Sequence, residues 1–179
     1  DLWKWMAAYE DKTGGRVLAI AHNGNLSNGR MFPIIESFTG KPIDKEYARS
    51  RDRWERLYEA TQTKGTGEAH PFLSPNDEFA NFEIWDKGNL DGSEAKQKEM
   101  LEFEYLRSAL KNGLKLEREL GTNPYKFGLV EAGAPHLLDR VVECHADDFR
   151  HESPLVHLAD VAVARIFELK PNFSARHEL

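Results

Sequence analysis

Five apolar residues in succession, Val17 to Ala21, end abruptly at His22 and restrict the fold more than any other segment. A short, uninterrupted apolar run is typical of a strand that is buried on both faces, as in parallel sheets. Polar residues at the carboxyl end of such strands are where α/β folds commonly place their chemistry. A neutral imidazole suits a divalent metal there, but it also suits a plain strand cap. The run therefore predicts an α/β fold and marks His22 as a candidate metal ligand.

Helical and strand-like patterns alternate along the rest of the chain. Apolar residues at helical spacing, together with capping residues, predict helices over 1–13, over 44–56, from Ser74 onward, and over 93–120 with a break near Gly113. Short apolar runs predict strands over 16–21, 57–62 and 126–130, with Glu59 or Gln62 near the end of the second. This order predicts parallel strands joined by helical crossovers, whose carboxyl ends meet at one edge of the sheet.

Histidines follow each of the predicted strands. His22 ends the first strand, His70 lies in the loop after the second, and His136 lies in the segment after the third. Histidine ligands, or histidines mixed with carboxylates, form hydrolytic metal sites when one coordination position stays open. The chain has 7 histidines, so some follow strands by chance. The pattern nevertheless favours a metal site at the shared edge.

Two asparagines, Asn23 and Asn25, follow His22 directly. Their amides are suited to holding substrate oxyanions. Asparagine also tolerates the left-handed backbone of a tight turn, which gives these positions a purely structural alternative. We expect them to bind substrate if the edge of the sheet is an active site.

Composition restricts the partners. The formal net charge is −6 and basic residues are scattered among acidic ones, which excludes an extended nucleic-acid surface. No apolar stretch approaches the roughly 20 residues that span a bilayer. We therefore expect a small-molecule substrate. The single cysteine, Cys144, fits a reducing compartment, but cytoplasm and periplasm both remain open as locations. The chain starts without methionine, and we expect its natural N-terminus upstream.

Long stretches of the chain carry a family resemblance. They are residues 1–33, 51–90 and 104–129. These stretches resemble a large, mostly bacterial family of unknown function that is related to the PHP (polymerase and histidinol phosphatase) metal-dependent hydrolases. The resemblance implies part of a PHP-like (β/α) barrel over residues 1–130, with parallel strands, crossover helices and divalent zinc, manganese or iron at the strand ends. Residues 131–179 are interpreted as a divergent tail.

The resemblance also implies roles for individual residues. His22 matches the middle metal-binding histidine of the PHP pattern. His70 lies in a family segment that belongs to the active site, and it is expected to act as a ligand or general acid. His136 stands in the late Asp-x-His motif and is a second expected ligand, although Ala134 replaces the aspartate. The early His-x-His pair has no counterpart in this chain.

These observations lead to a predicted function and its alternatives. The prediction is hydrolysis of a phosphoester or related ester by metal-activated water. An incomplete ligand set would bind metal more weakly, so a non-catalytic remnant that binds a ligand or partner is the alternative. A third hypothesis is a carbohydrate or anion site at Trp85, Asn89 and the glycine loop 65–67. The unpaired edges of a partial barrel would also favour homo-oligomers.

Overall fold

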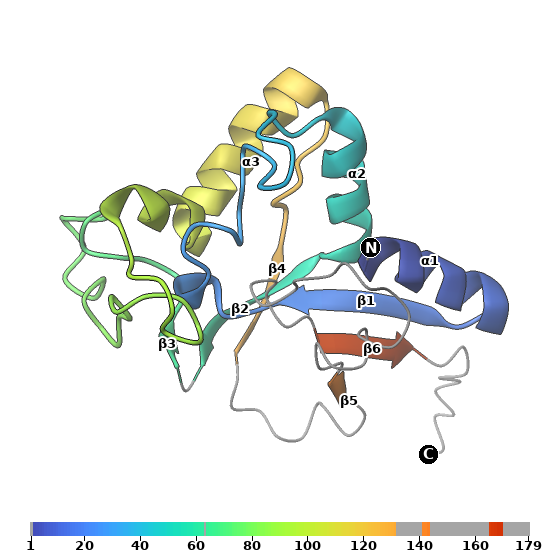
Figure 1. Cartoon of the computed structure of the whole chain (residues 1–179), viewed down its shortest axis with the longest axis horizontal. Helices are drawn as coiled ribbons and strands as arrows, with labels where there is room; N and C mark the ends of the chain where they lie inside the picture. The colour runs from blue at the N-terminus through green and yellow to red at the C-terminus, as the bar shows by residue number, and fades with distance from the viewer. Residues whose placement is uncertain (1, 63, 132–140, 144–164, 170–179) are drawn as a thin grey trace, which may run out of the picture.

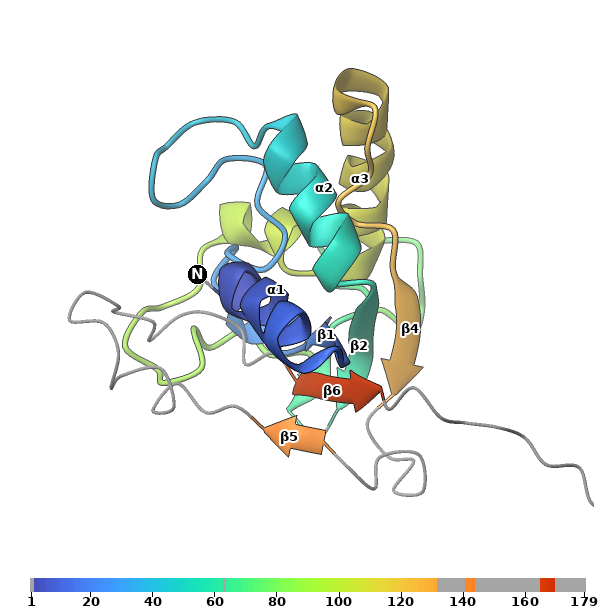
Figure 2. The ribbon, with the colours of Figure 1, turned by 90° about the vertical axis from the view of Figure 1, so that its right-hand side faces the viewer.

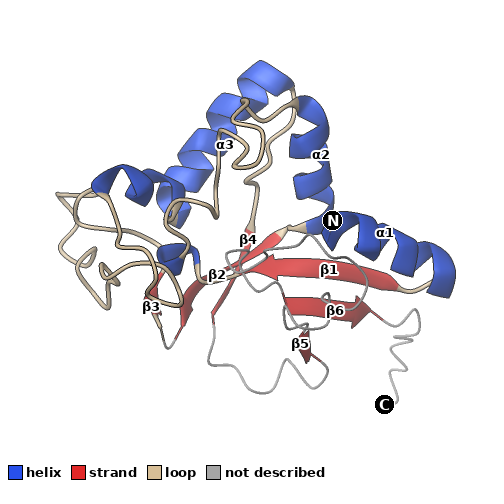
Figure 3. Ribbon diagram, viewed as in Figure 1, coloured by secondary structure: helices blue, strands red, loops and turns tan. Residues whose placement is uncertain are grey.

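The computed structural model describes residues 2–62, 64–131, 141–143 and 165–169. In chain order the elements are α1 (Leu2–Thr13), β1 (Arg16–Ala21), η1 (Gly24–Leu26), α2 (Lys45–Trp54), β2 (Leu57–Gln62), β3 (Gly65–Thr66), η2 (Lys98–Phe103), α3 (Leu106–Leu120), β4 (Gly128–Glu131), β5 (Val141–Glu143) and β6 (Arg165–Leu169). Figure 1 follows them from the N-terminus to the C-terminus, and Figure 3 separates helices, strands and loops.

The sheet is mixed, and its parallel part consists of β1, β2 and β4. Ala21 of β1 lies opposite Tyr58 of β2, and Leu57 of β2 lies opposite Gly128 of β4. On its other side β1 pairs antiparallel with β6, and β6 pairs antiparallel with β5. The predicted α/β class and parallel strands are therefore confirmed.

The predicted barrel is not what the described strands form. They make an open sheet in the order β3-β2-β1-β6-β5, with β4 paired to β2. A (β/α) barrel would need a further parallel strand beside β1, but β6 occupies that side and runs antiparallel. The sheet is consequently not closed.

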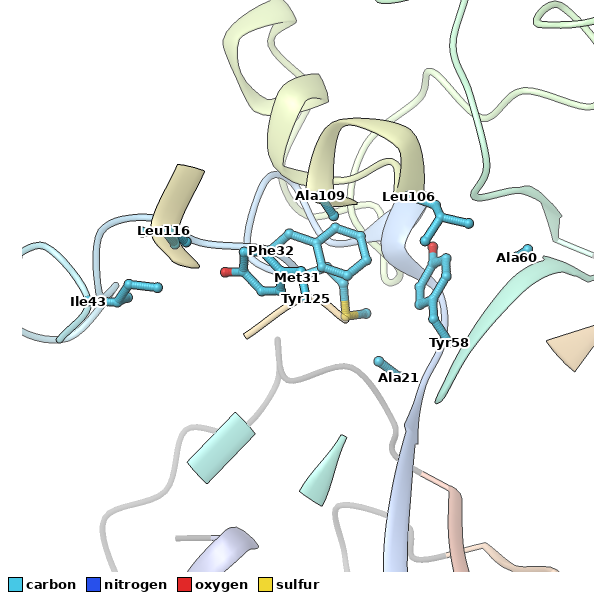
Figure 4. Packing of buried hydrophobic residues seen from close by; sticks show 10 residues of the cluster. All are labelled: Ala21, Met31, Phe32, Ile43, Tyr58, Ala60, Leu106, Ala109, Leu116 and Tyr125. Carbon is cyan, nitrogen blue, oxygen red and sulfur yellow. The ribbon is translucent and has the colours of Figure 1, made fainter. Parts of the chain in front are cut away.

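The helices α1, α2 and α3 cover one face of the sheet, as the side view in Figure 2 shows. Val17 and Ala19 of β1 pack against Met6 of α1. A larger apolar cluster joins Ala21, Met31, Phe32, Ile43, Tyr58, Ala60, Leu106, Ala109, Leu116 and Tyr125 (Figure 4). Because strand side chains alternate between faces, the residues between these positions on β1 and β2 belong to the opposite face, which none of the described helices covers.

Several predicted helix ends are confirmed. Asp44 caps α2 by accepting the backbone N–H of Tyr47 at 2.8 Å. Gly14 and Gly121 follow α1 and α3 in the left-handed conformation, with φ of 69° and 72°. None of the helices in the described part of the chain is both long and apolar enough to cross a membrane.

Two helix predictions are wrong. No helix starts at Ser74, because Asp77 accepts the backbone N–H of Phe79 and closes a turn, a structure that the same Ser, Pro, Asn and Asp residues favour. The long helix over 93–120 is divided into η2 and α3 at Glu104 and Tyr105 instead of breaking at Gly113. The backbone turns there and buries Glu104 completely.

Candidate active site

His22 and Glu59 lie side by side on the face of the sheet opposite the described helices, where the end of β1 meets the first half of β2. The register pairs Ala21 with Tyr58, so the next residues along the two strands are His22 and Glu59. His22 Nδ1 lies 3.4 Å from Glu59 Oε2. Both residues are buried, at 6% and 5% exposure. The predicted position of His22 at the strand end is confirmed, and a carboxylate accompanies it.

The His22–Glu59 pair leaves polar atoms without partners. Neither His22 Nε2 nor Glu59 Oε2 has a hydrogen-bond partner in the described structure, although both atoms are buried. Buried polar atoms without partners are uncommon, because each gives up its hydrogen bonds to water and gains none in the protein. In metal-binding histidines one ring nitrogen faces a carboxylate while the other holds the metal. The pair resembles this arrangement in that Nδ1 faces the Glu59 carboxylate at 3.4 Å, but no hydrogen bond joins them, and Nε2 has no partner among the described residues.

Among the described residues, His22 offers one suitable metal ligand, but a complete ligand set is not present. Among them, no group of three or more His, Cys, Asp or Glu side chains converges in a way that would hold an ion. His136, the second predicted ligand, lies outside the described residues. A complete site therefore needs donors in addition to His22 and its neighbour Glu59. Sequence reasoning gave Glu59 no role, although a carboxylate inside an otherwise buried strand is a visible signal.

Asn23 and Asn25 join the loop after β1 to the β2–β3 hairpin. Asn23 adopts the left-handed conformation, with φ 60° and ψ 32°. Its Oδ1 accepts hydrogen bonds from Gln62 Nε2 and, at 3.1 Å, from Lys64 Nζ. Asn25 Nδ2 donates to the backbone carbonyl of Lys64 at 3.1 Å. Both amides hold the hairpin beside the strand ends, and their substrate-binding role stays a prediction.

His70 has protein partners at both ring nitrogens. Nε2 lies 2.9 Å from Asp86 Oδ1, and Nδ1 accepts the backbone N–H of Phe72 at 3.0 Å. This pattern corresponds to a neutral ring with its proton on Nε2, directed at Asp86. The Tyr105 ring packs against it at a centroid distance of 5.3 Å. The arrangement positions the ring firmly, while its predicted role as ligand or general acid stays untested.

A buried ion pair fixes the other side of the loop after β1. Lys96 Nζ lies 2.7 Å from Glu104 Oε2 and donates to the backbone carbonyl of Asn25 at 2.5 Å. Both charged side chains are almost completely buried. Burial raises the pKa of the Glu104 carboxyl, and the positive charge of Lys96 opposes this rise. The pair ties the η1 turn to the junction of η2 and α3.

The residues proposed for a carbohydrate or anion site make hydrogen bonds or strand pairs within their own segments. Trp85 donates its indole N–H to the backbone carbonyl of Gly88 at 3.0 Å. Asn89 bonds to Ser93 and to the backbone N–H of Glu94. Gly65 belongs to β3, the short strand that pairs with β2. These contacts support loop structure, and the carbohydrate or anion role stays a prediction.

Comparison with known proteins places the chain in a family. A family model described as "Protein of unknown function (DUF3604)" matches residues 1–149. Searches of curated proteins and of solved structures found no match. The family match covers His22, Glu59, His70 and the asparagines of the loop after β1. With this match over most of its length, the chain belongs to the DUF3604 family.

Proposed function

We propose that this protein is a metal-dependent hydrolase of the PHP type, acting on a phosphoester or related ester, with His22 as one of its metal ligands. The observation that carries the proposal is the buried, unpartnered Nε2 of His22, whose other ring nitrogen faces Glu59. With its proton on Nδ1, toward Glu59, such a histidine would offer the free lone pair of Nε2 to a metal. The metal would be zinc, manganese or iron, the divalent ions that the sequence resemblance implies.

The position of the pair on the sheet supports the proposal. In (β/α) barrels the helices cover the outer face and the active site lies at the carboxyl ends of the strands. Here α1, α2 and α3 cover one face, while His22, which follows β1, and Glu59, the third residue of β2, lie on the other face. The described strands share with a barrel only the parallel order β1, β2, β4 and helices on one face; the sheet itself is open. Together with the PHP resemblance in the sequence, this favours a hydrolase.

Each residue of the proposed site has a separate task. Bound at His22 Nε2, a divalent metal would lower the pKa of its water and so supply a hydroxide nucleophile. Glu59 faces Nδ1 of His22 and would favour a proton there, which would leave Nε2 available. Lys64, bonded to Asn23 at 3.1 Å, brings a positive charge to the strand ends, where it favours an anionic phosphoester. Asn23 and Asn25 keep the hairpin that carries Lys64 in place.

Metal content tests the proposal directly. After dialysis without chelator, elemental analysis should find zinc, manganese or iron in the folded wild-type chain. His22→Ala should lose most of this metal, because it removes the donor. Glu59→Gln should weaken metal affinity by about 10- to 100-fold, the usual effect of losing an orienting partner. The matched control is Glu119→Gln on the exposed surface of α3, which should leave metal content unchanged.

Either of two results would contradict the proposal. An unchanged metal content in folded His22→Ala would remove His22 from the site. A wild-type chain that folds stably without metal and gains none from added zinc or manganese would instead favour the non-catalytic alternative. If metal binds, release of phosphate from simple phosphoesters should depend on that metal and should disappear in His22→Ala.

A further inference from the structure

A pocket of about 420 Å³ opens at the end of β2, next to the candidate site. Its wall includes Thr61, two residues after Glu59 on β2, and Ala69, which precedes His70. Two residues along a strand correspond to a distance of about 6.6 Å. The volume is within the range of small-molecule sites. The pocket therefore lies within reach of a substrate whose reacting group is at the strand ends.

Two phenylalanines give the pocket an aromatic wall. Phe79 and Phe82 both line it, yet their side chains are 75% and 67% exposed. Their backbones are fixed by turns, because Phe79 N donates to Asp77 Oδ1 and Phe82 N donates to the carbonyl of Phe79. Exposed aromatic rings beside a cavity are suited to a flat ring, which they contact by offset or edge-to-face packing.

The polar wall carries a net negative charge. Arg107, at the start of α3, donates from Nε and Nη2 to Glu68 Oε1 at 3.1 and 2.7 Å, and from Nη1 to Asp77 Oδ2 at 2.5 Å. A hydrogen bond from the Phe79 backbone and the Arg107 guanidinium keep the pKa of Asp77 below its ordinary value. Two negative carboxylates thus surround one positive guanidinium, which leaves the wall with a net negative charge. Glu68 Oε2 has no hydrogen bond to the described residues.

We propose that this pocket binds an aromatic group that carries a hydrogen-bond donor, preferably a protonated amine, and that it disfavours anions. The ring packs against Phe79 and Phe82, and the donor bonds to Glu68. The phosphate of a phosphoester does not suit this wall, since both carboxylates repel it. If the proposed hydrolase function holds, on which this extension rests, the pocket selects the organic part of the ester while the phosphoryl group stays at the strand ends.

Binding of small probes to the metal-free chain tests the pocket separately from the hydrolase. Phenethylamine, benzyl alcohol and benzoate are titrated in the presence of chelator and followed by ligand-detected NMR. Phenethylamine should bind most tightly and benzoate most weakly. Phe79→Ala and Phe82→Ala should each weaken phenethylamine binding by about three- to tenfold through lost ring contact. Phe38→Ala is the matched control, because Phe38 is 93% exposed and does not line the pocket.

A charge-removing variant tests the polar wall. Glu68→Gln should reduce the preference for phenethylamine over benzyl alcohol by about two- to fivefold, as expected for a partly exposed ion pair. Benzoate binding as tightly as phenethylamine, or unchanged binding in both phenylalanine variants, would overturn the assignment. Probe binding in a chain that takes up no metal would support the pocket assignment and overturn only the proposed hydrolase function.

Discussion

Gly67→Ala should destabilise the protein by about 2 kcal/mol, near the middle of the range for overpacked cores. A Cβ at this position would come closer than 3.0 Å to Tyr58 Oη, and Tyr58 is completely buried. The next atoms, Tyr58 Cζ and the carbonyl oxygen of Ala60, would be 3.2 and 3.5 Å away. The hydroxyl alone therefore causes most of the clash.

A double variant distinguishes this mechanism from a general loss of packing. Tyr58→Phe removes the hydroxyl, and in combination with Gly67→Ala it should recover a large part of the lost stability in urea unfolding. Gly24→Ala is the matched control. A Cβ there would clash with Tyr58 Oη and also with the backbone carbonyl oxygen of Glu104, which Tyr58→Phe leaves in place. Equal recovery of both alanine variants would contradict the geometry at Tyr58.

Lys96→Met should destabilise the protein by about 3–5 kcal/mol at neutral pH, the usual cost of removing one partner of a buried ion pair. Methionine has a similar length but no charge, so Glu104 would remain buried and unpaired. The loss should be measured by urea unfolding. Lys98→Met, two residues along the chain at an exposed position, is the control and should change stability little.

The effect of Lys96→Met should depend on pH in a defined direction. Burial raises the pKa of Glu104 above its ordinary 4.5, so the folded state holds this proton more tightly than the unfolded state. Stability from this group is therefore present below pH 4.5 and is lost as the pH rises through the folded pKa. Without Lys96 the folded pKa rises further. The variant should thus be closer to wild type at pH 5 than at pH 8, and an equal difference at both would contradict this account.

Local patterns predicted α1, α2, β1, β2, β4 and the place of His22, because each of these depends on neighbouring residues. The apolar run at 17–21 and the glycines at 14 and 121 act within one strand or one turn. The helix prediction at Ser74 was wrong because it, too, rested on neighbouring residues alone. Its capping residues also favour turns, and with Phe79 and Phe82 exposed there is no buried face to hold a helix together.

Local sequence patterns could not predict contacts between segments that are distant in the sequence. Glu59 meets His22 only because of the strand register, and Asp86 meets His70 only because a loop returns to it. Likewise, nothing near β1 in the sequence specifies that β6 pairs with it in the antiparallel direction. The apolar pattern of a strand indicates that it is buried in a sheet. It does not indicate which strands pair with it or in which direction they run.

The one-directional succession of β1, β2 and β4 distinguishes this sheet from nucleotide-binding doubly wound sheets. Doubly wound folds bind nucleotides in the crevice where strand order reverses and successive helices move to opposite faces. Between β1 and β4 the order does not reverse, and α2 and α3 pack into the same cluster on one face. This part of the chain therefore has no topological switch point, and its described parallel strands lack the nucleotide crevice of doubly wound sheets.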